Sequence, residues 1–191
     1  TGLKLVNSDN AFETMIKKAG LEVNKLADYA KDPEIWKEVM GLRNQAKRTT
    51  KRMQDNYIGG RLGQVIDVTG KDYDKIRGHR QLYQDLGYDT YMIFVNTSLE
   101  VALERNAKRE RSLPDALVQK MWQEVQNNIG RFQGLFGSDK MIIIDNSGSS
   151  EEDLKMAEKM ISQKRNIPVQ NPLGKIWLKE NDPANPRNGR L

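Results

Sequence analysis

Short apolar runs alternate with longer helix-like stretches through the middle of this chain. Three of the runs end in Asp, Asn or Thr, and they occupy residues 64–69, 91–97 and 141–146. Between them, apolar residues recur at the three-to-four-residue spacing of an amphipathic helix. Strands that alternate with helices are typical of a parallel sheet. We therefore predict an α/β fold in which a three-layer parallel sheet carries helices on both faces.

The N-terminal third contains one more predicted strand and a long helical segment. Residues 3–6 form a short apolar run, and the Asn-Ser-Asp-Asn that follows is typical of a helix N-terminus. Helical periodicity then covers about residues 10–58, with Pro33 in the first turn of the longest helix and Gly59-Gly60 at its end. This helical segment lies between the first two predicted strands.

Further helices are predicted between and after the later strands. Serine or threonine followed three positions later by glutamate is a capping box, and proline is favoured in the first turn of a helix. These signals, together with apolar periodicity, predict helices over residues 72–86, from Thr97-x-x-Glu100, from Pro114 and from Ser149-x-x-Glu152. The apolar stripe of the helix after Pro114 is interpreted as core packing.

The composition changes at residue 166. Four of the six prolines follow this position, with polar residues and glycine between them. We predict one domain over residues 1–165 and an extended, Pro-rich tail over residues 166–191. Trp177 is expected to anchor this tail as a short edge strand.

Composition narrows the class of protein. The chain has 191 residues, of which 37% are hydrophobic, and this suits one ordinary core. It has no cysteine, which excludes disulfides, zinc-thiolate sites and thiol nucleophiles and fits a reducing cytoplasm. The only histidine, His79, falls in a predicted helix without a Gly-x-Ser-x-Gly motif nearby, and we interpret it as structural or exposed. No apolar run reaches about 18 residues, so we expect a cytoplasmic protein without a membrane span.

The charge is more informative locally than overall. The net charge of +5 permits anionic partners without requiring them. Between Lys47 and Arg52, however, four of six residues are cations. This cluster is either a solvated helix face or a contact surface for phosphates.

Polar residues that end the predicted strands are candidate site residues, because ligands of an open parallel sheet bind beyond the carboxyl ends of its strands. Four segments in this order resemble the P-loop kinases of the polynucleotide-kinase and zeta-toxin-like group. They are Asn7-Ser-Asp9, Val65-Ile-Asp-Val-Thr-Gly-Lys71, Leu99-Glu-Val-Ala-Leu-Glu-Arg-Asn106 with Arg109 and Arg111, and Ile144-Asp-Asn146. The resemblance covers residues 3–164. It implies a P-loop NTPase-like sheet, a phage origin, and ATP with Mg²⁺ as cofactors.

The resemblance also implies a role for each strand-end residue. Asp9 matches the carboxylate that orients or deprotonates the acceptor hydroxyl. Asp67 and Thr69 match a pair near Mg²⁺ and phosphate, with Asp67 as the metal ligand. Asn146 matches the region near the base of the donor nucleotide. The alternatives are a simple helix cap for Asp9 and a buried, hydrogen-bonded strand residue for Asp67.

Three arginines match the lid that closes over the donor in these kinases, at about residues 105–113. Arg105 and Arg109 are four positions apart and are therefore predicted to share one helical face, and Arg111 follows them. Planar guanidinium groups suit a triphosphate better than lysine does. The alternative is a surface helix in which these arginines pair with neighbouring glutamates.

The chain departs from the family in one respect. No Gly-x-x-x-x-Gly-Lys-Ser/Thr loop occurs in its 191 residues. In the family, the strand of this loop lies in the middle of the sheet, between the strands predicted at residues 64–69 and 91–97. The first central strand is therefore absent here, which is expected to leave two unpaired strand edges. The chain is a fragment of a longer frame, its tail fills the gap, or it is a degenerate relative; we favour the fragment.

The predicted function follows from this resemblance. The intact protein is expected to move the γ-phosphate of ATP to a hydroxyl of an anionic acceptor: a nucleotide, a nucleic-acid 5′ end or a nucleotide sugar. The anionic acceptor is inferred from the basic cluster between the first two strands. The chain alone is expected to be inactive, because it lacks a phosphate cradle. The alternative is a non-catalytic, kinase-like scaffold that binds nucleic acid or a protein partner.

Overall fold

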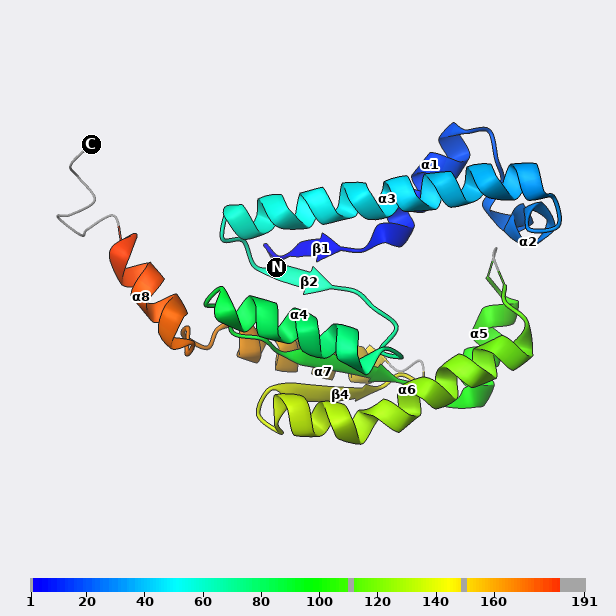
Figure 1. The fold of residues 1–191 in the computed structure, drawn as a ribbon. Coiled ribbons are helices and arrows are strands. Elements are labelled where there is room, and N and C mark those ends of the chain that lie inside the picture. Colours follow the sequence, from blue (N-terminus) through cyan, green and yellow to red (C-terminus); the bar gives the residue numbers. More distant parts are fainter. Residues whose placement is uncertain (1, 110–111, 149–150, 183–191) are drawn as a thin grey trace, which may run out of the picture. The chain divides into compact units, whose positions relative to one another are not determined.

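The fold was obtained as a computed structural model, which describes residues 2–109, 112–148 and 151–182 (Figure 1). The chain divides into two compact units. The first unit comprises Thr1–Thr69 and Glu104–Asp115, and the second comprises Gly70–Leu103 and Ala116–Leu191. Each unit has its own two-stranded sheet and its own apolar core, and each is described separately below.

The first unit packs a helical layer on a short parallel sheet. Its elements are β1 (Lys4–Val6), α1 (Ser8–Lys18), the 3₁₀ helix η1 (Val23–Lys25), α2 (Leu26–Tyr29), α3 (Pro33–Gly59) and β2 (Gln64–Ile66). β1 pairs in parallel with β2, so that Leu5 lies opposite Val65. Helices α1, α2 and α3 enclose a core formed by Phe12, Ile16, Val23, Leu26, Val39 and Ala46.

The helix boundaries of this unit follow local capping signals. Asn7 is the N-cap of α1, and its side chain accepts a hydrogen bond from the backbone amide of Asp9. Asp32 caps α3 in the same way, with Pro33 in the first turn, as the sequence predicts. α3 runs for 27 residues and ends at Gly59. The long helix predicted between the first two strands is therefore confirmed.

The second unit is built on another parallel pair. Its elements are α4 (Tyr73–Asp85), β3 (Met92–Asn96), α6 (Asp115–Phe136), β4 (Met141–Asp145), α7 (Glu151–Arg165) and α8 (Pro172–Glu180), while α5 (Leu99–Ala107) has residues in both units. β3 pairs in parallel with β4, so that Phe94 lies opposite Ile143. The core combines α6 with the two strands through Phe94, Phe132, Phe136 and Met141, and α4 contributes Tyr73 and Ile76.

The strands form two parallel pairs. β1 pairs with β2 and β3 pairs with β4, and in the described part of the chain no strand joins these two pairs. Parallel strands are normally covered on both faces, yet Val65 is 42% exposed and Val95 is 57% exposed.

No helix among the described residues has the length and hydrophobicity that a membrane crossing requires.

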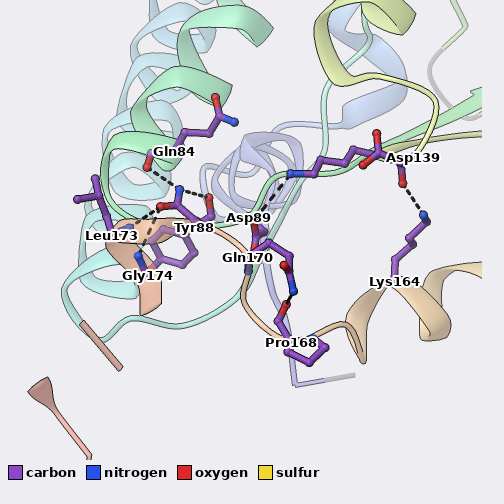
Figure 2. Close-up of polar contacts among 11 residues, drawn as sticks. Gln84, Tyr88, Asp89, Asp139, Lys164, Pro168, Gln170, Leu173 and Gly174 are labelled. Atoms are coloured by element: carbon purple, nitrogen blue, oxygen red, sulfur yellow. Dashed lines mark hydrogen bonds and ion pairs between the residues drawn. The ribbon is translucent and has the colours of Figure 1, made fainter. Parts of the chain in front are cut away.

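The C-terminal segment forms a helix, so the prediction of an extended tail with Trp177 in an edge strand is wrong for residues 172–180. Asn171 caps α8, and its amide nitrogen donates to the carbonyl oxygens of Gln84 at 2.9 Å and Tyr88 at 3.1 Å (Figure 2). The backbone amide of Gln170 donates to Asp89 at 2.6 Å. These contacts hold the start of α8 against the turn that follows α4.

Candidate functional site

In the first unit, the two residues that directly follow β1 and β2 are hydrogen-bonded to each other. The side-chain amide of Asn7 donates to a carboxylate oxygen of Asp67 at 2.8 Å. The backbone amide of Asp67 donates to the carbonyl of Val6 at 3.1 Å, which extends the strand pairing by one residue. The carboxyl ends of these parallel strands therefore meet at a polar cluster, where ligands of such sheets bind.

The candidate carboxylates of this unit are exposed. Asp9 lies in the first turn of α1, but Asn7 is the N-cap, so the interpretation of Asp9 as the helix cap is wrong. β2 ends at Ile66 instead of Thr69, and this places Asp67 and Thr69 in an exposed loop. Asp67 is therefore not a buried strand residue, because its carboxylate reaches solvent while Asn7 donates to it.

The candidate arginines do not share one helix. α5 ends at Ala107, which places Arg105 in the helix and Arg109 in the turn after it. The backbone amide of Arg109 donates to the carbonyl of Asn106 at 3.1 Å, three residues back, so the last turn tightens and the α-helical pattern does not continue. The prediction of a common helical face for the two arginines is therefore wrong. Arg111 lies outside the described residues.

The predicted pairing of these arginines with glutamates is not seen among the described residues. Glu104 pairs with Lys108 instead, at 2.5 Å, and the hydrogen bond from Lys108 lowers the pKa of the Glu104 carboxyl. Within the described ranges, neither Arg105 nor Arg109 has a carboxylate within ion-pair distance. Their guanidinium groups therefore remain available to an anion.

Asn106 closes the loop that carries these arginines. Its side chain is buried, donates to the carbonyl of Leu113 at 2.8 Å and accepts from the backbone amide of Leu113 at 2.9 Å. Both backbone groups of Leu113 are thus satisfied by one amide side chain, which ties the far end of the loop to α5.

In the second unit, polar residues follow both strands at their carboxyl ends. The backbone amide of Asn146 donates to the carbonyl of Asn96 at 2.8 Å. The Ser147 hydroxyl accepts from the backbone amide of Ser98 at 2.9 Å, and the Ser147 amide donates to Asp145 at 2.9 Å. Hydrogen bonds from Ser147 lower the pKa of the Asp145 carboxyl. Ser98, and not Thr97, caps α5, because its hydroxyl accepts from the amide of Val101.

Polar side chains from α6 support these strand ends. Trp122 donates to the carbonyl of Thr97 at 2.9 Å, and Gln126 donates to the side chain of Asn96 at 2.8 Å. Asn128 is buried and donates to the carbonyls of Gly70 and Lys71, at 3.2 and 2.9 Å. Sequence reasoning assigned α6 to core packing alone and missed these contacts. The available signal was weak, because Gln126 and Asn128 are two of several polar residues in this helix.

The described residues do not form a metal site of several converging side chains. Among them, no group of three or more His, Cys, Asp or Glu side chains converges. Mg²⁺ is commonly held by one or two carboxylates together with waters and substrate phosphates. The exposed carboxylate of Asp67 therefore fits as a single Mg²⁺ ligand, provided that phosphate oxygens complete the coordination.

The two units thus place candidate residues in separate groups. Asn7, Asp9, Asp67, Thr69, Arg105 and Arg109 belong to the first unit, and Asn146 belongs to the second. In the first unit, the arrangement can present carboxylates and guanidinium groups to a phosphorylated ligand. In comparisons of the chain with known proteins, no family model matches it, and no curated protein does.

Proposed function

We propose that this chain is the main part of a phosphotransferase that moves the γ-phosphate of ATP, with Mg²⁺, to a hydroxyl of an anionic acceptor. The observation that carries the proposal is the pairing of Asn7 with Asp67, which sets an exposed carboxylate at the carboxyl ends of two parallel strands. Phosphoryl transfer depends on positioning and on neutralising charge, and carboxylates with arginines supply both.

Each candidate residue has a role in this proposal. Asp9, exposed in the first turn of α1, orients the acceptor hydroxyl or accepts its proton. Asp67 holds Mg²⁺, and Thr69 contacts a phosphate from the same loop. Asn146, the residue after β4, would contact the base of the donor nucleotide. The nucleotide, nucleic-acid 5′ end and nucleotide sugar are the acceptor classes that fit.

The arginines would neutralise the charge of the transferred group. Arg105 and Arg109 have no carboxylate partner among the described residues, and Arg111 continues the same basic segment. Guanidinium groups donate in a fixed fork that matches phosphate oxygens. Asn106, which ties the loop to α5, would hold the base of this lid.

The proposed reaction needs one part that these 191 residues do not contain. No Gly-x-x-x-x-Gly-Lys-Ser/Thr loop is present, so nothing in the chain can cradle the β- and γ-phosphates with successive backbone amides. The isolated chain is therefore expected to transfer no phosphate. An active protein would have to obtain this cradle from polypeptide outside these 191 residues.

The coding DNA upstream of Thr1 provides the first test. If it continues in frame and encodes an apolar strand and the missing loop, the longer protein should transfer labelled γ-phosphate to at least one of the three acceptor classes. Asp67→Asn and Arg105→Ala should then abolish transfer. Asp74→Asn and Arg77→Ala, which alter an exposed ion pair of 3.1 Å on α4, are the matched controls and should retain it.

Two results would overturn the proposal. One is a start codon directly before Thr1, because the active protein would then lack the cradle. The other is turnover by the isolated chain within the usual kinase range of about 1–100 s⁻¹, since the catalytic machinery would then differ from the one proposed.

A further inference from the structure

Four cations lie together on the outer face of α3. Lys47, Arg48, Lys51 and Arg52 are all exposed. Lys47 and Lys51 are one helical turn apart, as are Arg48 and Arg52, so the four side chains form two adjacent rows. Each row advances by about 6 Å along the helix axis between its two cations. We call this group the α3 basic face.

Most of the charge on the α3 basic face is not neutralised within the described structure. Lys51 pairs with Asp55 at 2.7 Å, and both side chains are more than half exposed. Exposed pairs of this kind are weak and are easily exchanged for another anion. Among the described residues, Lys47, Arg48 and Arg52 make no ion pair or hydrogen bond through their side chains. The face is therefore a local surplus of positive charge.

The surroundings of these cations are polar. Asn44, Gln45 and Thr49 are exposed beside them and carry side-chain hydrogen-bond donors. The apolar side of the same helix is already used, because Val39 and Ala46 are buried in the core with α1 and α2. The exposed apolar side chains of α3, which are Trp36, Met40 and Met53, lie outside residues 44–52. The α3 basic face itself therefore offers no apolar stripe to insert into a lipid surface.

We propose that the α3 basic face binds the phosphate backbone of a nucleic acid, without reading its sequence. Regularly spaced cations along a straight helix suit a linear array of phosphates, and the amide and hydroxyl side chains beside them can donate to phosphate oxygens. The two arginines can each engage a phosphate with two parallel hydrogen bonds. This inference does not depend on phosphoryl transfer, because its test measures binding alone.

The test compares two variants of the 191-residue chain that lose equal charge. The first, Lys47→Gln/Arg48→Gln/Arg52→Gln, removes three cations from the α3 basic face and keeps good helix formers in their place. The matched control, Lys17→Gln/Lys18→Gln/Lys37→Gln, removes three exposed lysines from α1 and from the first turns of α3. Fluorescence anisotropy with a labelled, mixed-sequence DNA strand of about 20 nucleotides reports binding between about 50 and 200 mM salt.

The α3 variant should bind at least about tenfold more weakly at low salt. The negative slope of log affinity against log salt should become shallower by about 2, because three phosphate contacts are lost. The control should keep both the affinity and the slope. Circular dichroism checks that both variants remain folded.

Three results would overturn the inference. They are a wild-type chain that does not bind the strand, an equal loss of affinity in the two variants, and an α3 variant that binds as the wild type does. Binding to phosphatidylserine vesicles that depends on the same three cations, without binding to DNA, would assign the face to a lipid surface instead.

Discussion

The side-chain nitrogen of Asn7 lies 2.8 Å from a carboxylate oxygen of Asp67, and its side-chain oxygen lies 2.7 Å from the backbone nitrogen of Asp9. One amide therefore caps α1 and also holds the loop after β2. To accept from a backbone amide and donate to a carboxylate at the same time, a side chain needs both an acceptor and a donor. The geometry of both candidate carboxylates thus depends on Asn7.

Asn7→Ala is expected to destabilise the first unit. Loss of an N-cap costs about 0.5–2 kcal/mol, and the hydrogen bond to Asp67 is lost as well. Asn7→Ser keeps a capping oxygen but removes the donor to Asp67, so its effect should be smaller. Urea denaturation measures the free energy of unfolding of each variant. Asn10→Ala, at an exposed first-turn position, is the control, and a loss equal to that of Asn7→Ala would contradict the capping role.

Asp145 is expected to titrate below the ordinary aspartate range. Hydrogen bonds from the hydroxyl and backbone amide of Ser147 favour its ionised form and lower its pKa. A depressed pKa in the folded state contributes stability above the unfolded-state pKa, and this contribution is lost as pH falls through the folded-state pKa.

Ser147→Ala should raise the pKa of Asp145, because the side-chain hydrogen bond is the largest cause of the shift. Carboxyl chemical shifts followed by NMR across the acidic range measure this directly. Ser98→Ala removes the hydroxyl that caps α5 and should leave the Asp145 titration unchanged. An unchanged titration in Ser147→Ala would show that Ser147 does not set the pKa.

The elements with strong local signals were predictable from sequence. α3 has a capping aspartate, a first-turn proline and a long apolar period, and its boundaries agree with the prediction. α4, β3 and β4 are similarly close to their predicted ranges. These signals suffice because capping and periodicity depend only on residues a few positions apart.

Contacts between distant residues were not predictable in the same way. Asn7 and Asp67 are 60 positions apart, so their hydrogen bond depends on the pairing of β1 with β2. α8 was missed because its Pro172 and Gly174 are usually read as helix breakers. Pro172 instead occupies the first turn, and α8 is held by partners more than 80 positions away. The arginine loop likewise depends on Asn106, which an amphipathic pattern cannot distinguish from a core position.

Asn106→Ala is expected to loosen the loop that carries the candidate arginines. Removing this buried side chain leaves the amide and carbonyl of Leu113 without their present partner, at a cost of about 1–3 kcal/mol. Trypsin should then cleave faster after Arg109, which limited proteolysis with mass spectrometry can measure. Asn127→Ala removes an exposed amide that pairs only with Gln123, and should leave the cleavage rate unchanged. Equal cleavage in both variants would show that Asn106 does not anchor the loop.

Gly174→Ala is expected to detach α8 from the second unit. A Cβ at this position would overlap the carbonyl oxygen of Gly87 and lie 2.8 Å from a methyl group of Val169. The first neighbour is backbone and cannot move aside alone. Gly87 has φ +89°, and a Cβ there would lie 2.8 Å from the backbone nitrogen of Gly174, so neither glycine can take a side chain. Overpacking of this kind costs about 1–3 kcal/mol.

Hydrogen exchange of the α8 backbone amides measures this effect directly. In Gly174→Ala, these amides should lose protection, while those of β3 and β4 keep theirs because the core around Phe132 is not altered. Gly130→Ala is the matched control. Gly130 lies in α6 with no neighbour within 4 Å of an added Cβ, so alanine should stabilise that helix by about 0.5–1 kcal/mol. Full protection of α8 in Gly174→Ala would mean that the helix docks without the close approach of the two glycines.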